Sequence, residues 1–253
     1  MSIIVYADFA CPECYLAGRR ADVLAAAKVP VDFRAVEHRP NLPIDGLLLS
    51  ADDMDAVSAR FEALRDLLLP GEELPWSRPN RAPKSEASVS AYAEAYGSPV
   101  ESDVRRLLFD LYWHDSADIG DPKVLRSPLS GPMLRSGSTV DSVRQSGYAV
   151  SVDRGPISTT AYRRIQEWRA EWRELGFPAL PVVLVDGATL HGMEALRRLG
   201  KEIGFVGAEI DPARPDPRRY PHVDVRPPPP WVSQIGGRWR NDYRPGGIAG
   251  LTR

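Results

Sequence analysis

The sequence predicts an α/β fold in which two separated β-rich segments flank a block of helices. Three observations support this prediction. Short apolar, β-branched runs at 3–7, 31–35 and 181–185 have the composition of buried strands. Apolar residues recur at helical spacing between these runs. The last run is followed by Asp186-Gly187, a strong signal for a two-residue hairpin turn.

The first forty residues are expected to form a β-α-β unit. Ile3–Ala7 is the first strand and Val31–Ala35 the second. A helix lies between them and ends at Val29-Pro30, because the residue before a proline is displaced from the α region. The apolar stripe of this helix comprises Ala17, Ala21, Leu24 and Ala25, and it leaves Arg19 and Arg20 off the stripe.

The middle of the chain is predicted to be helical. Helical stripes are formed by Met54, Val57, Phe61, Leu64 and Leu68, by the Ala-rich stretch 85–96, by Val104, Leu107, Leu108 and Leu111 with Ser102 as N-cap, and by Ile165, Trp168, Trp172 and Leu175. The Ser/Gly/Pro-containing region 127–156 is expected to be looser.

The C-terminal third contains a β-hairpin and a last helix. The strand 181–185 is expected to turn back through Asp186-Gly187 into a strand at 188–190, before a short helix at 193–199 that ends at Gly200. From Asp211 onward the composition is rich in Pro and Gly, which indicates an extended tail.

Bulk composition excludes several classes of partner. The chain has 253 residues, is 43% hydrophobic and 26% charged, and carries a net charge of −2. We therefore expect no nucleic-acid partner and no binding to a membrane surface. No apolar run approaches the roughly 20 residues that span a bilayer. The N-terminus lacks the pattern of a signal peptide, which predicts a cytoplasmic protein.

The chain has two cysteines, and they are separated by two residues in Cys11-Pro12-Glu13-Cys14, at the predicted junction of the first strand and helix. A helix N-terminus stabilises a thiolate, which is the nucleophile of thiol–disulfide exchange. Pro12 suits the first helical position because it has no N–H and its φ is already helical. We expect Cys11 to be the exposed nucleophile, Cys14 to be the buried resolving cysteine, and the charge of Glu13 to oppose the thiolate.

Two other interpretations of the cysteine pair are weaker. Inert core thiols are common, but two cysteines flanking a proline at a strand–helix junction favour redox chemistry. A structural zinc site requires four ligands, and neither a second Cys-x-x-Cys nor a suitably spaced histidine pair accompanies this one. We therefore expect no metal.

The segment 8–17, Asp-Phe-Ala-Cys-Pro-Glu-Cys-Tyr-Leu-Ala, resembles the opening of DsbA-like thioredoxin-fold proteins of the FrnE type. It is also similar to the branch of 2-hydroxychromene-2-carboxylate isomerases and kappa-class glutathione transferases. The stretches 118–125 and 181–187 resemble parts of the same group. The resemblance implies a thioredoxin-like fold with an α-helical insertion, here followed by a Pro/Gly-rich C-terminal tail. Accordingly, we predict a thioredoxin-like domain from 1–45 and 156–210, an insertion at 46–155 and a tail at 211–253.

The resemblance also assigns site residues. It implies that Pro181 is a cis-proline facing the cysteines, with Pro178 as the competing candidate, and that Leu180 presents its backbone to a substrate. The chain departs from the family pattern at Glu13, where an aromatic residue is frequent, and at Leu180, where Val or Thr is common. The isomerase branch usually has Ser at the position of Cys11, so the presence of both cysteines favours redox exchange.

The leading hypothesis is thus a thiol–disulfide oxidoreductase with Cys11, Cys14, Pro12 and Pro181 as its catalytic set. Leu180, Glu13, Asp8 and Trp113 are candidates for substrate contact. Asp8 could also relay a proton for the cysteine pair or serve as a strand-end aspartate, and Trp113 could instead be a packed core residue. The expected partner is a disulfide- or thiol-containing protein or small molecule.

Two further functions remain open. One is a small-thiol-dependent isomerase or transferase, and the other is a redox-sensing binding module. No cofactor is expected, although glutathione or another low-molecular-weight thiol is considered as co-substrate. Related proteins are often dimers, so a homodimer is considered as well.

Overall fold

The computed structural model describes residues 2–75, 77–135 and 158–210. The predicted Pro/Gly-rich tail from 211 to 253 lies outside the described residues. The predicted looser region 127–156 lies partly outside them, from residue 136 onward.

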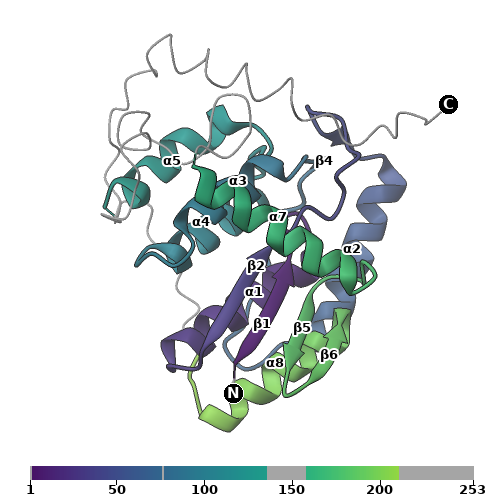
Figure 1. The fold of residues 1–253 in the computed structure, drawn as a ribbon. Helices are drawn as coiled ribbons and strands as arrows, with labels where there is room; N and C mark the ends of the chain where they lie inside the picture. The colour runs from purple at the N-terminus through teal and green to yellow at the C-terminus, as the bar shows by residue number, and fades with distance from the viewer. Residues whose placement is uncertain (1, 76, 136–157, 211–253) are drawn as a thin grey trace, which may run out of the picture.

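A four-stranded mixed sheet forms the centre of the protein (Figure 1), with strand order β2-β1-β5-β6. β1 (Ile3–Ala7) runs parallel to β2 (Val31–Ala35) and antiparallel to β5 (Val182–Val185). β6 (Ala188–His191) pairs antiparallel with β5 and forms an edge. This arrangement confirms the predicted strands and the thioredoxin-like fold.

Helices pack on the sheet and beyond one of its ends. α1 (Pro12–Ala26) and α8 (Gly192–Val206) pack against each other, and α1 also contacts β1 and β2. α7 (Thr159–Glu174) contacts β2, and the hydroxyl of Tyr6 in β1 donates a hydrogen bond to Glu171 of this helix. Because side chains alternate along a strand, Ile3, Val5 and Ala7 point to the face opposite Tyr6.

The chain between β2 and α7 supplies most of the remaining helices. These are α2 (Ala51–Arg65), α3 (Glu86–Ala95), α4 (Glu101–Trp113) and α5 (Pro122–Arg135), with a short hairpin of β3 (Leu47–Leu48) and β4 (Arg81–Ala82). In Figure 1, α3, α4 and α5 gather beyond the end of β1 where the chain leaves the sheet, and α2 lies to one side. The domain boundaries proposed from the sequence stay a prediction.

Two predicted helix limits are wrong. α8 continues through Gly200 to Val206 and ends at Gly207, whose φ of 62° provides the left-handed cap. Gly200 is tolerated inside the helix because it packs against the guanidinium of Arg20, which a Cβ would approach to 3.3 Å. In α4, Ser102 lies within the first turn and is not the N-cap, since the helix begins at Glu101.

The predicted looser region is also partly wrong, because α5 extends to Arg135 despite Pro128 and Pro132. Both prolines remove a helical N–H, which normally disfavours a helix interior. Leu125, Leu129 and Met133 compensate, since they recur every four residues and all are fully buried.

Arg20 departs from its predicted position off the apolar stripe. Its side chain is 1% exposed and forms an ion pair with the buried Glu72, at 2.7 Å. It also donates hydrogen bonds to the carbonyls of Leu67 and Leu196. The guanidinium thereby ties α1 to α8 and to the segment that follows α2, with each partner compensating the burial of its charge.

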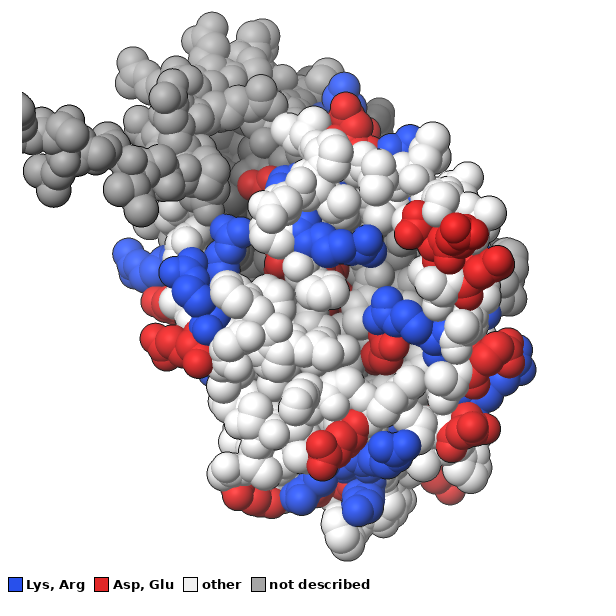
Figure 2. Space-filling model, turned by 90° about the vertical axis from the view of Figure 1, so that its right-hand side faces the viewer, with Lys and Arg blue, Asp and Glu red and all other residues white. Residues whose placement is uncertain are grey.

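One face of the protein shows no dominant charge. On the side that faces right in Figure 1, basic and acidic groups are interspersed and neither sign forms a continuous patch (Figure 2). In the part of the chain that the structure describes, no helix is long and apolar enough to cross a bilayer.

Gly18 is a position where packing forbids a side chain. A Cβ at Gly18 would lie 2.5 Å from Cε2 of Phe109, where α1 crosses α4. We expect Gly18→Ala to lower the free energy of unfolding by about 1–3 kcal/mol through overpacking, measured by urea denaturation. The matched control is Gly204→Ala in α8, which meets no atom within 4 Å and should leave stability unchanged or raise it. Equal stabilities for the two variants would contradict the packing argument.

Candidate active site

Cys11 stands at the junction of β1 and α1. It is the N-cap of α1, and Pro12 occupies the first helical position as predicted. The amide groups of the first helical turn are oriented toward this end, where their dipole favours a negative sulfur. Cys11 is 4% exposed and Cys14 is fully buried. The expectation of an exposed Cys11 is therefore wrong, although Cys14 is the more buried of the two.

The segment that precedes Cys11 is fixed by the buried carboxylate of Asp8. One oxygen accepts the backbone N–H of Ala10 at 2.9 Å. The other accepts the backbone N–H of His38 at 2.7 Å and the hydroxyl of Ser85 at 3.0 Å. Asp8 thus joins the end of β1 to the residues after β2 and to the start of α3. These contacts support the strand-end role for Asp8, and its action on a proton or a substrate stays a prediction.

Trp113 supports the same segment from the interior. It is 1% exposed, its indole N–H donates to the carbonyl of Phe9 at 2.9 Å, and its ring packs against Phe61 of α2. Because it is buried, the side chain acts on the site through Phe9 in this structure. Direct contact between Trp113 and a substrate stays a prediction.

The two cysteines differ in their electrostatic environments. Burial raises the pKa of the Cys14 thiol well above its ordinary value, and the hydrogen bond and charge of Cys11 add to this effect. Cys14 therefore remains protonated at neutral pH while Cys11 is reduced. Both cysteines are free thiols in the structure.

The loop before β5 faces Cys11. The Leu180–Pro181 peptide bond is cis, as the family resemblance predicts, whereas the competing Pro178 is not in a cis bond. The carbonyl oxygen of Leu180 lies 3.9 Å from the Cys11 sulfur. The carbonyl of Pro181 accepts the N–H of Gly192, which connects the loop to the start of α8. Leu180 and Pro181 are therefore next to the nucleophile, and their catalytic roles stay proposals.

Glu13 is not an isolated negative charge beside the cysteines. Its carboxylate forms a two-point ion pair with Arg60 of α2, in which Arg60 Nε donates to Glu13 Oε1 at 2.8 Å and Nη2 donates to Oε2. The same Nη2 lies 3.6 Å from the sulfur of Cys11. Arg60 is not among the site residues predicted from the sequence. The predicted effect of Glu13 on the thiolate therefore leaves out the cation that is paired with its carboxylate.

A signal for Arg60 was present in the sequence. The residue stands three after Val57 and four before Leu64, so it shares a helical face with two members of the α2 apolar stripe. A cation within such a stripe needs a partner. Its partner, Glu13, lies 47 positions earlier, and no local spacing connects the two residues.

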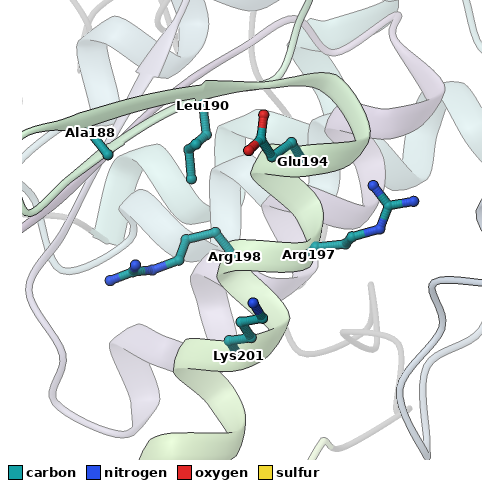
Figure 3. A pocket seen from close by; sticks show the side chains of 6 residues that line it. All are labelled: Ala188, Leu190, Glu194, Arg197, Arg198 and Lys201. Atoms are coloured by element: carbon teal, nitrogen blue, oxygen red, sulfur yellow. The ribbon is translucent and has the colours of Figure 1, made fainter.

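A surface pocket lies elsewhere, between β6 and α8 (Figure 3). It is lined by Ala188, Leu190, Glu194, Arg197, Arg198 and Lys201. None of the predicted site residues lines it. Arg198 is already bonded to Asp186 and Glu202. Among the described residues, no group of three or more His, Cys, Asp or Glu is arranged to hold a metal ion.

Comparison with known proteins places the chain in a family. The profile of the DSBA-like thioredoxin domain matches residues 2–131, which is slightly more than half of the 253 residues. The chain belongs to this family. Its enzyme class is accordingly that of the thiol–disulfide oxidoreductases, consistent with the paired cysteines at the start of α1. No sequence among curated proteins matches the chain.

Solved structures with this fold include three whose identity to the chain is low. A probable DsbA oxidoreductase from Streptomyces coelicolor is 17% identical with a TM-score of 0.58, covering 85% of this chain and 93% of its own. The cytosolic disulfide reductase DsbM from Pseudomonas aeruginosa is 11% identical with a TM-score of 0.53, covering 82% and 97%. A 2-hydroxychromene-2-carboxylate isomerase is 18% identical with a TM-score of 0.52, covering 82% and 96%. At these identities the similarity concerns the fold.

The difference between the two thiols predicts different alkylation rates. In native protein at neutral pH, we expect Cys14 in the Cys11→Ser variant to react with iodoacetamide at least about tenfold more slowly than Cys11 in Cys14→Ser. Burial raises the pKa of Cys14, so its thiolate, and hence its reactivity, should increase only as the pH rises above the ordinary range of a thiol.

Intact-mass measurement of the alkylated protein over time gives both rates. In concentrated guanidinium chloride the two variants should react alike, because the difference comes from the fold. Equal rates in the native proteins would contradict the assignment of Cys14 as the shielded thiol.

Proposed function

We propose that the protein catalyses dithiol–disulfide exchange with Cys11 as the attacking and Cys14 as the resolving cysteine. The observation that carries this proposal is the placement of the pair. Cys11 is the N-cap residue at the positive end of α1. Cys14 lies one helical turn further along, is fully buried, and is close enough for Cys11 to raise its pKa. Of the two sulfurs, Cys11 is the less buried and lies at the N-terminus of α1, whose dipole favours a thiolate.

The reaction proceeds in two displacements. The Cys11 thiolate attacks one sulfur of a substrate disulfide, forming a mixed disulfide and releasing the other sulfur as a thiolate, which takes up a proton. Cys14 then loses its proton and attacks the Cys11 sulfur, which releases the second substrate thiol and leaves a Cys11–Cys14 disulfide. The substrate gains two electrons and two protons, and the protein loses them. Run in reverse, the same steps oxidise a dithiol substrate.

The Leu180–Pro181 loop is proposed to hold the substrate during attack. It lies directly across from Cys11, with the Leu180 carbonyl 3.9 Å from the sulfur. An extended backbone laid along this loop would bring its own sulfur to Cys11 without the help of a particular side chain. The proposed partner is therefore a disulfide- or thiol-containing protein or small molecule. A low-molecular-weight thiol such as glutathione would regenerate the starting form.

A small-thiol-dependent isomerase or transferase is the second candidate. The observation that favours it is the half-exposed guanidinium of Arg60, 43% exposed and 3.6 Å from the sulfur, which could bind the carboxylate of a small thiol. The 2-hydroxychromene-2-carboxylate isomerase has the same fold, so this fold is compatible with an isomerase. In this reaction Cys14 would be dispensable.

Cytoplasmic location and homodimer formation also stay predictions.

The test is equilibration of the full-length protein in a series of glutathione redox buffers, followed by acid quenching, alkylation and intact-mass analysis. We expect a reversible loss of two hydrogens in the wild-type protein and none in Cys14→Ser or Cys11→Ser, because each variant lacks one sulfur of the pair. Disulfide exchange with a model substrate should collapse in both variants.

The Cys14→Ser variant separates the two candidates. If it retains turnover in a small-thiol transferase or isomerase assay while exchange is absent from the wild-type protein, the second candidate replaces the first. If the wild-type thiols alkylate equally in every buffer and never pair, the exchange proposal is wrong.

A further inference from the structure

We infer that the Arg60–Glu13 ion pair controls the ionisation of Cys11. Glu13 stabilises the thiol form of Cys11, and Arg60 stabilises its thiolate form. This inference rests on the proposed function, since it concerns the sulfur that attacks. It assigns a role in the reaction to a helix, α2, that carries neither cysteine.

The geometry gives each form of the sulfur its own partner. The Cys11 thiol donates to Glu13 Oε2 at 3.3 Å. Arg60 Nη2 lies 3.6 Å from the same sulfur, so it can donate to a thiolate, which is an acceptor. Glu13 Oε2 accepts both from the Cys11 thiol and from Arg60 Nη2. When the thiol loses its proton, its contact with Glu13 becomes repulsive and the Arg60 contact becomes a charge-assisted hydrogen bond.

Arg60 is available for this role because its charge is permanent and its position is fixed. Burial alone would lower the pKa of Arg60. The hydrogen bond to Glu13 and the charges of Cys11 and Glu13 outweigh this effect, so the pKa lies above its ordinary value. The guanidinium remains 43% exposed, whereas Glu13 beneath it is 9% exposed. The cation is thus the partner of this ion pair that is in contact with solvent.

The helix that carries Arg60 is anchored at both ends and at its centre. Ser50 and Asp53 form a reciprocal capping box at its start. Phe61 and Leu64 are fully buried at its centre and end. Beyond the helix, the carbonyl of Leu67 is held by the buried Arg20 clamp. These contacts keep Arg60 over the cysteine.

Other charges around the cysteine pair act at longer range or through the backbone. Asp8, at the end of β1, acts electrostatically on Cys14. His38 and Arg39 follow β2. Burial lowers the pKa of His38, the charge of Asp8 opposes this shift, and the charges of Arg39, Arg60 and Glu13 have smaller effects. Loss of charge at Arg60 should therefore change the ionisation of Cys11, because it is the cation in contact with the sulfur.

The same pair should influence the redox equilibrium. Reduction of the Cys11–Cys14 disulfide by two glutathione molecules yields the dithiol and one glutathione disulfide, and a stabilised Cys11 thiolate favours the dithiol side. Removal of Arg60 should shift this equilibrium toward the protein disulfide by up to about tenfold, which corresponds to about 30 mV for two electrons.

The experiment measures the pH dependence of Cys11 alkylation in full-length Cys14→Ser protein carrying Arg60→Gln, Arg60→Lys, Glu13→Gln or both glutamine substitutions. We expect Arg60→Gln to move the midpoint of the profile up by about 1 pH unit. Glu13→Gln should move it down, and the double variant should return close to the starting value. Arg60→Lys should leave the midpoint close to the starting value because it keeps the charge.

Arg65→Gln is the matched control, because Arg65 lies on the same helix in an exposed pair with Glu62. Its profile should coincide with the unsubstituted one. The inference is overturned if Arg60→Gln also coincides with it, or if Arg60→Gln and Glu13→Gln move the midpoint in the same direction. If Arg60→Gln alone does not fold, the double variant is compared with Glu13→Gln, because neither carries a buried carboxylate that has lost its cation. The midpoint of the double variant should lie above that of Glu13→Gln, and coincident midpoints would overturn the inference.

Failure of this inference is distinct from failure of the proposed function. The proposed function is judged by the loss of two hydrogens in the wild-type protein, whereas this inference is judged by the midpoint of alkylation. A wild-type protein that forms its disulfide, together with an Arg60→Gln profile that does not move, would overturn the inference alone.

Discussion

The buried carboxylate of Asp8 is the constraint on which the geometry of the site depends. It satisfies donors from the turn before Cys11, from the residues after β2 and from the start of α3. A buried carboxylate is costly unless hydrogen bonds compensate it. Each of the three segments supplies one of these hydrogen bonds to Asp8, so the carboxylate holds them together. Trp113 adds a hydrogen bond to the Phe9 carbonyl from α4. The position of Cys11 is therefore determined by the helical block as much as by the strand and helix it connects.

Local patterns were sufficient to predict most of the sheet and the start of α1. The β-branched runs, the Asp186-Gly187 turn and Pro12 at the first helical position each depend on neighbours within a few residues. The errors arose where a tertiary contact changed a local preference. Gly200 does not end α8 because it accommodates Arg20, and the prolines of α5 do not break it because its apolar face is buried.

The site was predictable to the extent that its residues are adjacent in sequence. Cys11 and Cys14 were found from their spacing, and the position of Pro181 came from resemblance to a family. Arg60 could not be assigned in this way, since it meets Glu13 only through the packing of α2 on α1. The low exposure of Cys11 likewise results from segments that are distant in the sequence, including the Leu180 loop.

The complete burial of Cys14 also has a consequence for the oxidation of the cysteine pair by peroxide. Thiolates are oxidised to sulfenic acid, and an exposed sulfenic acid can proceed irreversibly to sulfinic acid. Cys14 is fully buried and its pKa is raised, so we expect oxidation to begin at Cys11. A sulfenic acid formed there has a thiol one helical turn away, and condensation with it yields a disulfide and water. The shielded cysteine thereby converts a damaging oxidation into a form that an ordinary thiol can repair.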